Sequence, residues 1–246
     1  MIDFEDFNFG DILDENFSIV AEELDLSEKD QDKKDGEEQA IFPILPVRNM
    51  VMFPSIITPI TAGREQSKLL IEEAQREGEY IGIVSQRNAG IENPEEEDLY
   101  DIGTIVKVVK IIKLPDGNTT AITKGIHRFK ISKFISEKPY FRAEIKKLKD
   151  TSSKNKEEYE ALIANIKDLA LKIIQLDPNI PNAANFAINN LNDSNDLLNF
   201  ICSNASFSIV EKQKLLEEKS FQKRAEAAYE LLLEAYRKLE LRNQIH

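Results

Sequence analysis

The spacing of apolar residues changes near residue 151, and this change separates two kinds of structure. Before it, short β-branched or alternating runs recur, which is the pattern of half-buried strands. After it, apolar residues recur every three or four positions, which is the pattern of amphipathic helices. Strands followed by a run of helices favour an α+β fold. We therefore expect a β-rich domain over residues 41–150 and an α-helical domain over residues 151–246.

The β-rich part contains several candidate strands. They cover residues 41–47, 56–60, 80–84, 103–112, 119–123, 128–131 and 141–148. The two prolines of the first run argue for an edge or terminal strand, because proline cannot donate a hydrogen bond to a neighbouring strand. The sequence Leu114-Pro115-Asp116-Gly117-Asn118 is typical of a tight turn. It predicts a hairpin that pairs roughly residues 104–113 with 118–125.

Helices are expected in both parts. One should begin at Gly63-Arg64-Glu65-Gln66-Ser67 and end at Gly78, where glycine favours the left-handed backbone of a helix end. In the second part we expect helices that end before Pro178, cover about 182–191, start near 193–195, start at Ser208 and run from about 221 to 245. Ser208 and Glu211 form a capping-box pattern. The last helix shows no C-terminal cap, which predicts that the native chain continues beyond His246.

The acidity of the chain is confined to residues 1–40. They hold 15 of its 44 acidic residues and only 3 of its 32 basic ones, which accounts for the whole net charge of −12. Such a segment cannot offset its ordering entropy by burial, so we expect a disordered, solubilising tail. Docking on a partner through the aromatic residues Phe4, Phe7, Phe9 and Phe17 is the alternative. The neutral remainder gives no electrostatic case for nucleic-acid binding, which usually needs a basic face, although a neutral total leaves room for a local basic patch.

The inventory of reactive side chains excludes most catalytic schemes. The only histidines are His127 and His246, and the only cysteine is Cys202. These are too few and too scattered for a nucleophile–base pair or a metal site, and His127 is expected on the surface in a turn that leads into a strand. No phosphate-binding or dinucleotide-binding glycine motif occurs. We predict no catalytic residue, no cofactor-binding residue and no metal ligand in this chain.

The N-terminus and the hydropathy pattern predict where the protein resides. The opening Met1-Ile2-Asp3-Phe4-Glu5 has no basic segment followed by an apolar core, so it is not a secretory signal. No apolar run is long enough to span a membrane. A single cysteine fits a reducing compartment. We therefore expect a cytoplasmic protein with no membrane partner.

A series of short motifs follows the expected strands and helices. They are Leu45-Pro46-Val47-Arg48-Asn49 with Phe53-Pro54, Gly63-Arg64-Glu65-Gln66-Ser67, Val84-Ser85-Gln86, Ile102-Gly103-Thr104, Leu114-Pro115-Asp116-Gly117, Gly125 with Arg128, and Ser208-Ile209-Val210-Glu211-Lys212-Gln213-Lys214-Leu215-Leu216-Glu217. In this order they resemble the N-terminal, substrate-binding region of Lon-type ATP-dependent proteases. The resemblance covers residues 41–246.

The resemblance implies a fold and a function. The fold would be a PUA-like β-rich pseudo-barrel followed by a helical bundle, whose last long helix leads toward an ATPase module that is not in this chain. The function would be substrate recognition and organisation of a hexameric ring, in a serine protease that degrades misfolded and short-lived regulatory proteins. The full-length enzyme would use ATP, Mg²⁺ and a Ser-Lys dyad. None of these catalytic parts is present in the 246 residues, so this chain alone is not expected to be an enzyme.

Recognition of unfolded chains needs accessible apolar surface. Met50, Val51, Met52 and Phe53 are the first candidates, because they lie in a predicted loop and methionine adapts to varied partners. The alternative is that these four residues plug the end of the barrel.

A second candidate is the start of the helix near residue 64. There Arg64, Glu65 and Lys68 would contact charged stretches of substrate, the alternative being a solvated helix end. A third possibility is that an exposed face of the last helix forms coiled contacts between subunits.

Two other functions remain open at the level of sequence. One is a free-standing binding module with the same domain and no enzyme modules, against which the uncapped last helix argues. The other is a PUA-like RNA-binding protein, against which the neutral charge and the lack of aromatics interleaved with Arg or Lys argue.

Overall fold

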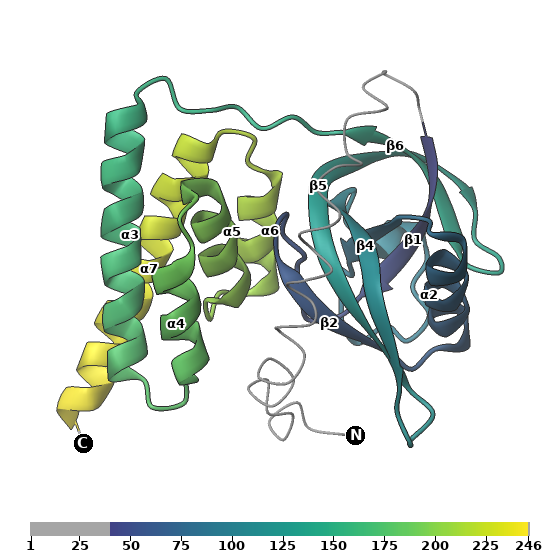
Figure 1. The fold of residues 1–246 in the computed structure, drawn as a ribbon, viewed down its shortest axis with the longest axis horizontal. Helices are drawn as coiled ribbons and strands as arrows, with labels where there is room; N and C mark the ends of the chain where they lie inside the picture. The colour runs from purple at the N-terminus through teal and green to yellow at the C-terminus, as the bar shows by residue number, and fades with distance from the viewer. Residues whose placement is uncertain (1–39, 246) are drawn as a thin grey trace.

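The computed structural model describes residues 40–245, so the expected acidic tail and His246 lie outside the described residues. Within this range every strand lies between residues 40 and 147, and a run of helices occupies residues 156–245. Figure 1 shows the strands as a curved sheet on one side and the helices packed beside it. The expected α+β class is therefore confirmed.

The sheet curls into a barrel. Its strands are β1 (Ala40–Val47), β2 (Ile57–Ala62), β3 (Ile81–Ser85), β4 (Ile102–Lys113), β5 (Thr119–Ser136) and β6 (Phe141–Lys147). They are ordered β2-β5-β4-β3-β1-β6, and β5 pairs with β6 as well. This last pairing closes the sheet, because β5 is long enough to pair with β2 and β4 in its first part and with β6 in its second. The predicted hairpin is confirmed, with Lys113 opposite Thr119 across the turn.

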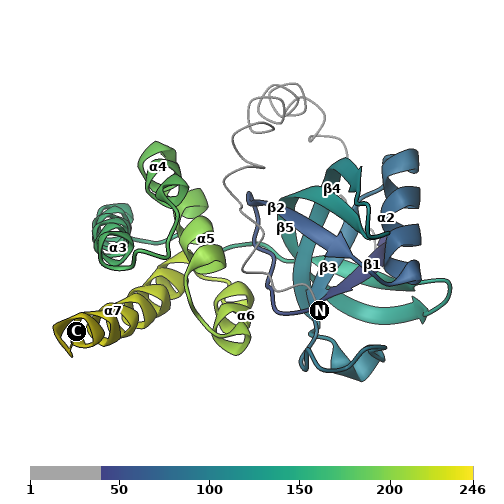
Figure 2. The same cartoon turned by 90° about the horizontal axis from the view of Figure 1, so that it is seen from below.

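Helix α2 (Glu65–Glu77) covers the side of the barrel farthest from the other helices (Figures 1 and 2). Leu70, Ile71 and Ala74 are its buried apolar face and pack into the core of the barrel. The helix ends where the sequence predicts. Gly78 has a φ of 68°, the left-handed backbone that glycine adopts at low cost.

Two predicted strands are one strand in the structure. The runs 119–123 and 128–131 both belong to β5, so the expectation of a turn around His127 is wrong. The sequence pattern is interrupted there by a bulge, since Val106 pairs with Gly125 while Ile105 pairs with His127. Gly125 marks a close approach of two backbones, because a Cβ at this position would clash with the carbonyl oxygen of Phe53.

The expectation that β1 is an edge or terminal strand is also wrong, because β1 lies between β3 and β6. Its two ladders hardly overlap. Residues 40–44 pair with β6, and residues 44–47 pair with β3. Each proline therefore lies where one side of β1 has no neighbouring strand. A missing N–H costs no ladder hydrogen bond on such a side.

The helical part consists of α3 (Lys156–Leu176), α4 (Asn182–Asn190), α5 (Ser194–Asn204), α6 (Ile209–Glu217) and α7 (Phe221–Ile245). The long helices α3 and α7 run side by side in the same direction (Figure 1). Ser153 contacts Gln222 near their first turns, and Asn243 donates to the carbonyl of Leu176 near their ends. The capping box of Ser208 and Glu211 is confirmed. Over residues 40–245, no helix has the length and apolar character of a membrane span.

The sheet and the helices share one apolar core. Val51, Phe53 and Ile56, which precede β2, are buried in the same cluster as the inner faces of the helices. Beside this cluster, fully buried Arg128 of β5 and Arg224 of α7 both lie 2.8 Å from Oδ1 of Asp150. Gln213 of α6 donates to the carbonyl of Ile102 at 3.0 Å. The two parts are thus joined by apolar and polar contacts.

Candidate functional site

Arg64 precedes α2 and holds three segments of the barrel together. Its Nη2 donates to the carbonyl of Pro46 at 3.1 Å and to Oε1 of Gln86 at 3.2 Å. Its Nη1 donates to the carbonyl of Glu92 at 3.1 Å. Burial, and then the charge of Arg48, lower the pKa of Arg64. These bonds fix the guanidinium at the mouth of a hollow beside β1.

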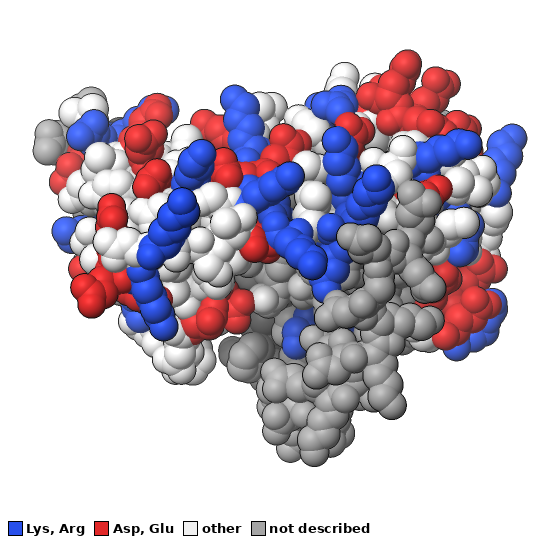
Figure 3. Space-filling model, turned by 90° about the horizontal axis from the view of Figure 1, so that it is seen from above, with Lys and Arg blue, Asp and Glu red and all other residues white. Residues whose placement is uncertain are grey.

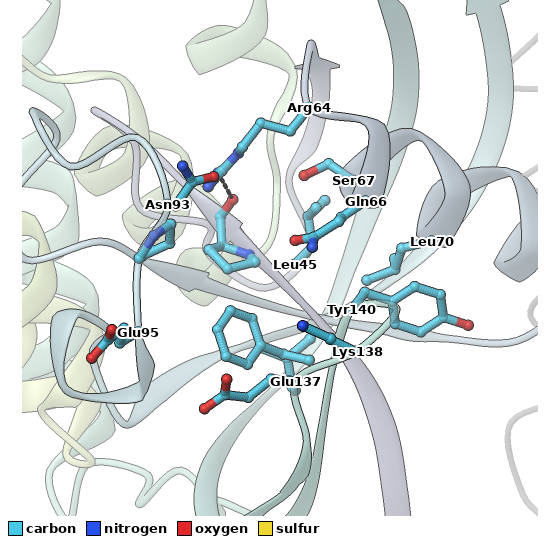
Figure 4. Close-up of a pocket in the computed structure, with 14 residues that line it drawn as sticks. Leu45, Arg64, Gln66, Ser67, Leu70, Asn93, Glu95, Glu137, Lys138 and Tyr140 are labelled. Atoms are coloured by element: carbon cyan, nitrogen blue, oxygen red, sulfur yellow. Dashed lines mark hydrogen bonds between the residues drawn. The ribbon is translucent and has the colours of Figure 1, made fainter.

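This hollow, which we call the β1 groove, has a volume of about 270 Å³. Figure 4 shows how its side chains converge from β1, from the first turns of α2 and from the loop before β6. The lining combines apolar and polar groups: Ile44, Leu45, Pro46, Arg64, Gln66, Ser67, Leu70, Asn93, Pro94, Glu95, Glu137, Lys138, Tyr140 and Phe141. Its place in the fold follows from the pairing of β1, which beyond Ile44 has no strand on the β6 side.

Glu65 and Lys68 lie on a second hollow, of about 410 Å³, between α2 and the β4–β5 hairpin. Lys68 Nζ donates to the carbonyl of Gly117 at 3.0 Å and lies 2.6 Å from Glu65 Oε1. Lys113 pairs with Glu72 across the same hollow at 2.9 Å. The surface here is charged, and the charges are already paired within the chain. It suits a polar or charged stretch better than an apolar one.

The four residues from Met50 to Phe53 are held inside the molecule. Val51, Met52 and Phe53 are 3%, 2% and 0% exposed, and Met50 is partly buried. Thr104 Oγ1 donates to the carbonyl of Met52 at 2.6 Å, and Ser85 Oγ donates to that of Met50 at 2.6 Å. These burials favour the alternative stated for this run, in which it plugs the end of the barrel.

The structure therefore places Arg64 on the β1 groove and Glu65 and Lys68 on the second hollow, and it buries most of the Met50–Phe53 run. Sequence reasoning did not find the apolar walls of the β1 groove, Tyr140 and Phe141. Tyr140 OH donates to Glu73 of α2 at 2.7 Å, so it joins the two sides of the groove. The sequence holds no local signal for them, because they reach the groove through the pairing of β6 with β1.

The remaining reactive groups lie away from the grooves. Cys202 is buried among the helices, and desolvation raises the pKa of its thiol to about 12. His127 is half-buried, and desolvation lowers its pKa. Among residues 40–245 no three His, Cys, Asp or Glu side chains come together as metal ligands could.

A family model decides what the chain is related to. The model of the ATP-dependent protease La (LON) substrate-binding domain matches residues 41–234. The chain belongs to this family. The Lon protease of Flavobacterium johnsoniae is 40% identical over 222 residues, which are 89% of this chain and 27% of that protein. The Lon protease of Cytophaga hutchinsonii is 37% identical over 223 residues, 90% of this chain and 27% of that protein. The chain thus spans about a quarter of the length of these curated relatives.

Solved structures agree on the fold. The N-terminal domain of Mycobacterium avium complex Lon protease has a TM-score of 0.62 at 21% identity, and the match covers 78% of this chain and 98% of that one. A Lon N-terminal domain protein from Xanthomonas campestris has a TM-score of 0.55 at 15% identity, with 76% and 95% covered. The resemblance stated from the motifs is therefore confirmed.

Proposed function

We propose that this segment recruits unfolded protein chains for a Lon-type ATP-dependent protease, and that it binds them in the β1 groove as extended segments. The family supports the recruiting role, because its model describes a substrate-binding domain. The place of binding rests on one observation, which is the unpaired side of β1 beyond Ile44.

An unpaired side of a strand is a site for an extended peptide, which adds main-chain hydrogen bonds while pockets take its side chains. In β1 the carbonyl of Pro46 faces this side and is bonded to Arg64 instead of a strand. Arg64 keeps the carbonyl satisfied in the free protein, and an arriving peptide N–H would exchange with it. Leu45 and Leu70 form the floor of the groove at 2% and 1% exposure, and Phe141, at 9%, offers more of the apolar contact that exposed side chains of an unfolded protein lack.

The charged hollow lies at the same end of α2, where Glu65 and Lys68 follow Arg64. We propose that Glu65 and Lys68 contact charged stretches that flank the apolar segment, and that Met50 is the member of the buried run nearest to substrate. Val51, Met52 and Phe53 would then act by holding β1 and β2 in place. A groove that combines apolar and polar walls with one strand carbonyl, that of Pro46, as acceptor for a peptide N–H would accept many sequences, which is what a quality-control protease requires.

The wider role follows the family. We propose that the full-length protein is a cytoplasmic ATP-dependent serine endopeptidase that assembles into a hexamer, with ATP, Mg²⁺ and the Ser-Lys dyad in modules outside this chain. Residues 41–150 would act as the recruiting domain and residues 151–246 as the helical domain that links it to the ATPase module. The acidic tail, residues 1–40, is not needed for recruitment in this proposal.

The test is to fill the groove. Gln66 is exposed on α2 and lines the β1 groove, whereas exposed Gln75 on the same helix lines neither hollow. We expect Gln66→Trp to weaken binding of a permanently unfolded, fluorescently labelled protein by about tenfold, since a lost groove contact of about 1.4 kcal/mol is tenfold in affinity. Gln75→Trp is the matched control and should bind as the parent does. Equal affinities for the two variants would place substrate binding elsewhere.

A further inference from the structure

Two arginines meet at one end of the β1 groove without a carboxylate to balance them. Nη2 of Arg48 and Nη1 of Arg64 each donate to the backbone carbonyl of Glu92 at 3.1 Å. The other acceptors of Arg64 are the carbonyl of Pro46 and the side-chain amide of Gln86, which are neutral as well. Among the described residues neither guanidinium forms an ion pair. Two like charges are thus held together, one of them half-buried, and an anion bound beside them would offset the cost.

The first turn of α2 adds hydrogen-bond donors at the same end. The side chain of Arg64 makes no capping hydrogen bond, so the backbone N–H groups of Gln66 and Ser67 have no partner among residues 40–245. The hydroxyl of Ser67 has none there either, although this residue is only 8% exposed and lines the groove. Figure 4 shows the hydroxyl pointing to the side where the guanidinium of Arg64 lies. Free amides at a helix start, a hydroxyl and a guanidinium are the donors that bind carboxylates.

The carboxylates of the neighbouring segments do not fill this place. Glu65 pairs with Lys68 on the second hollow at 2.6 Å. Glu95 accepts a hydrogen bond from within its own 3₁₀ turn. Glu137 lines the groove, but Figure 4 shows it across the groove from Arg64. One end of the groove is therefore cationic and has no counter-charge among the described residues.

The direction of these donors favours the end of a chain over an acidic side chain. In an extended strand the N–H and C=O of one residue point toward the same neighbouring strand, whereas side chains point to the two faces. A bound residue whose N–H reaches the carbonyl of Pro46 therefore directs its own C=O toward β1 and Arg64. Asn93 and Pro94 line the groove beside Glu92, which both arginines hold, so this segment stands where the bound chain would continue.

We propose that this end of the β1 groove binds the C-terminal carboxylate of the substrate chain. Ser67 Oγ and the free amides of α2 donate to the carboxylate, and Arg64, released from Pro46 by the arriving N–H, pairs with it. Arg48 adds a second positive charge. The inference rests on the proposed function, because it needs an extended chain in the groove. It makes the free C-terminus the part of an unfolded protein that is captured first.

Three forms of one peptide test this by fluorescence anisotropy with the chain 1–246. The peptide carries a fluorescent label at its N-terminus and apolar residues at alternate positions. It is made with a free C-terminus, with an amidated C-terminus, and amidated with one Asp in its middle. The third form is needed because Figure 3 shows basic side chains gathered across the middle of one face, where charge alone can attract a peptide. The free acid should bind about tenfold more tightly than either amidated form, which is about 1.4 kcal/mol.

Two variants test the donors. Ser67→Ala and Arg48→Gln should each reduce the preference for the free acid to about threefold or less and leave the affinity for the amidated peptide unchanged. Ser203→Ala in α5 and Arg76→Gln in the last turn of α2 are the matched controls, because neither residue lines the groove. Both controls should keep the full preference.

The outcomes separate this site from the proposed function. If all three peptides bind equally and Gln66→Trp weakens each of them, the groove binds substrate but the carboxylate site is overturned. The site is also overturned if the Asp form binds as tightly as the free acid, or if the preference persists in both Ser67→Ala and Arg48→Gln. If none of the peptides binds, the carboxylate site falls, and the labelled unfolded protein with Gln66→Trp still decides whether the groove binds substrate.

Discussion

Arg128 of β5 donates a 2.7 Å hydrogen bond from Nη1 to the backbone carbonyl of Leu216, next to the last residue of α6. This bond joins the barrel to the helices through a side chain that is 0% exposed. Nη2 lies 2.8 Å from Asp150 Oδ1 as an ion pair, although neither Nη2 nor Nε is aligned for a hydrogen bond. Burial and the charge of Arg224 lower the pKa of Arg128, while Asp150 opposes this.

Arg128→Met should therefore destabilise the chain. It leaves the carbonyl of Leu216 buried without its donor, and a loss of about 2–3 kcal/mol is expected in the free energy of unfolding. Urea titration followed by circular dichroism measures it. Arg142→Met is the control, since Arg142 and Glu79 form a half-exposed pair at 3.2 Å whose loss should cost less than about 1 kcal/mol. Similar losses in the two variants would mean that Arg128 does not tie the two parts together.

Gly125→Ala tests the close approach between β5 and the segment before β2. A Cβ at residue 125 would clash with the carbonyl oxygen of Phe53, and Ser55 and Ile56 are bonded to the backbone of Gly125 on either side. The backbones must separate, which should cost about 1–3 kcal/mol. Gly90→Ala, whose Cβ would meet only the exposed side chain of Asn88, should change stability by less than about 0.5 kcal/mol. If Gly125→Ala left the free energy of unfolding unchanged, the backbones at residues 53 and 125 could separate at little cost.

Consecutive residues before β2 pack on opposite sides. Met52 belongs to the core of the barrel, whereas Phe53 belongs to the core shared with the helices. Met52→Ala should therefore speed hydrogen exchange in β3 and β4, and Phe53→Ala should speed it in α5 and α6. Each truncation should cost about 2–5 kcal/mol, because both residues are fully buried. If both variants loosen the same amides, the two cores behave as one unit, and the division near residue 150 is not an energetic boundary.

The sequence predicts the elements well where local chemistry decides them. The end of α2 at Gly78, the start of α6 at Ser208 and the turn at Gly117 depend on a few adjacent residues, and all lie where expected. The position of β1 and the continuity of β5 were predicted wrongly. Both features depend on which strands pair with β1 and β5, and the residues within a strand do not show which strand will be its neighbour.

The candidate site shows the same limit. Arg64, Glu65 and Lys68 were found because a helix start and a motif mark them in the sequence. The burial of Val51 and Phe53 follows from the helices that pack over them more than one hundred residues later in the chain, whereas Met52 is buried in the core of the barrel. Tyr140 and Phe141 reach the β1 groove only because β6 turns back beside β1. The hydrophobic pattern alone thus does not show which distant segments of the chain contact one another.

Cys202 predicts how stability depends on pH. Desolvation raises the pKa of its thiol to about 12 in the folded chain, whereas an unfolded cysteine ionises near pH 8.5. Because the pKa of this thiol is higher in the folded chain than in the unfolded one, its contribution to the free energy of unfolding is complete below about pH 8.5. That contribution is lost as the pH rises toward the pKa of the folded chain. Between pH 8.5 and 10.5 the free energy of unfolding should therefore fall by roughly 1 kcal/mol per pH unit on account of this thiol.

The measurement is urea unfolding at a series of pH values for the parent chain and for Cys202→Ser. The variant keeps a small side chain at position 202 but has no group there that ionises in this range. The difference in free energy of unfolding between parent and variant at each pH therefore reports the thiol alone, without the lysines and tyrosines that both chains share. The difference should narrow steadily above pH 8.5, because only the parent loses stability by this route. A difference that stays constant up to pH 10.5 would show that Cys202 ionises as readily in the folded chain as in the unfolded one, and that the helical core around it is open to water.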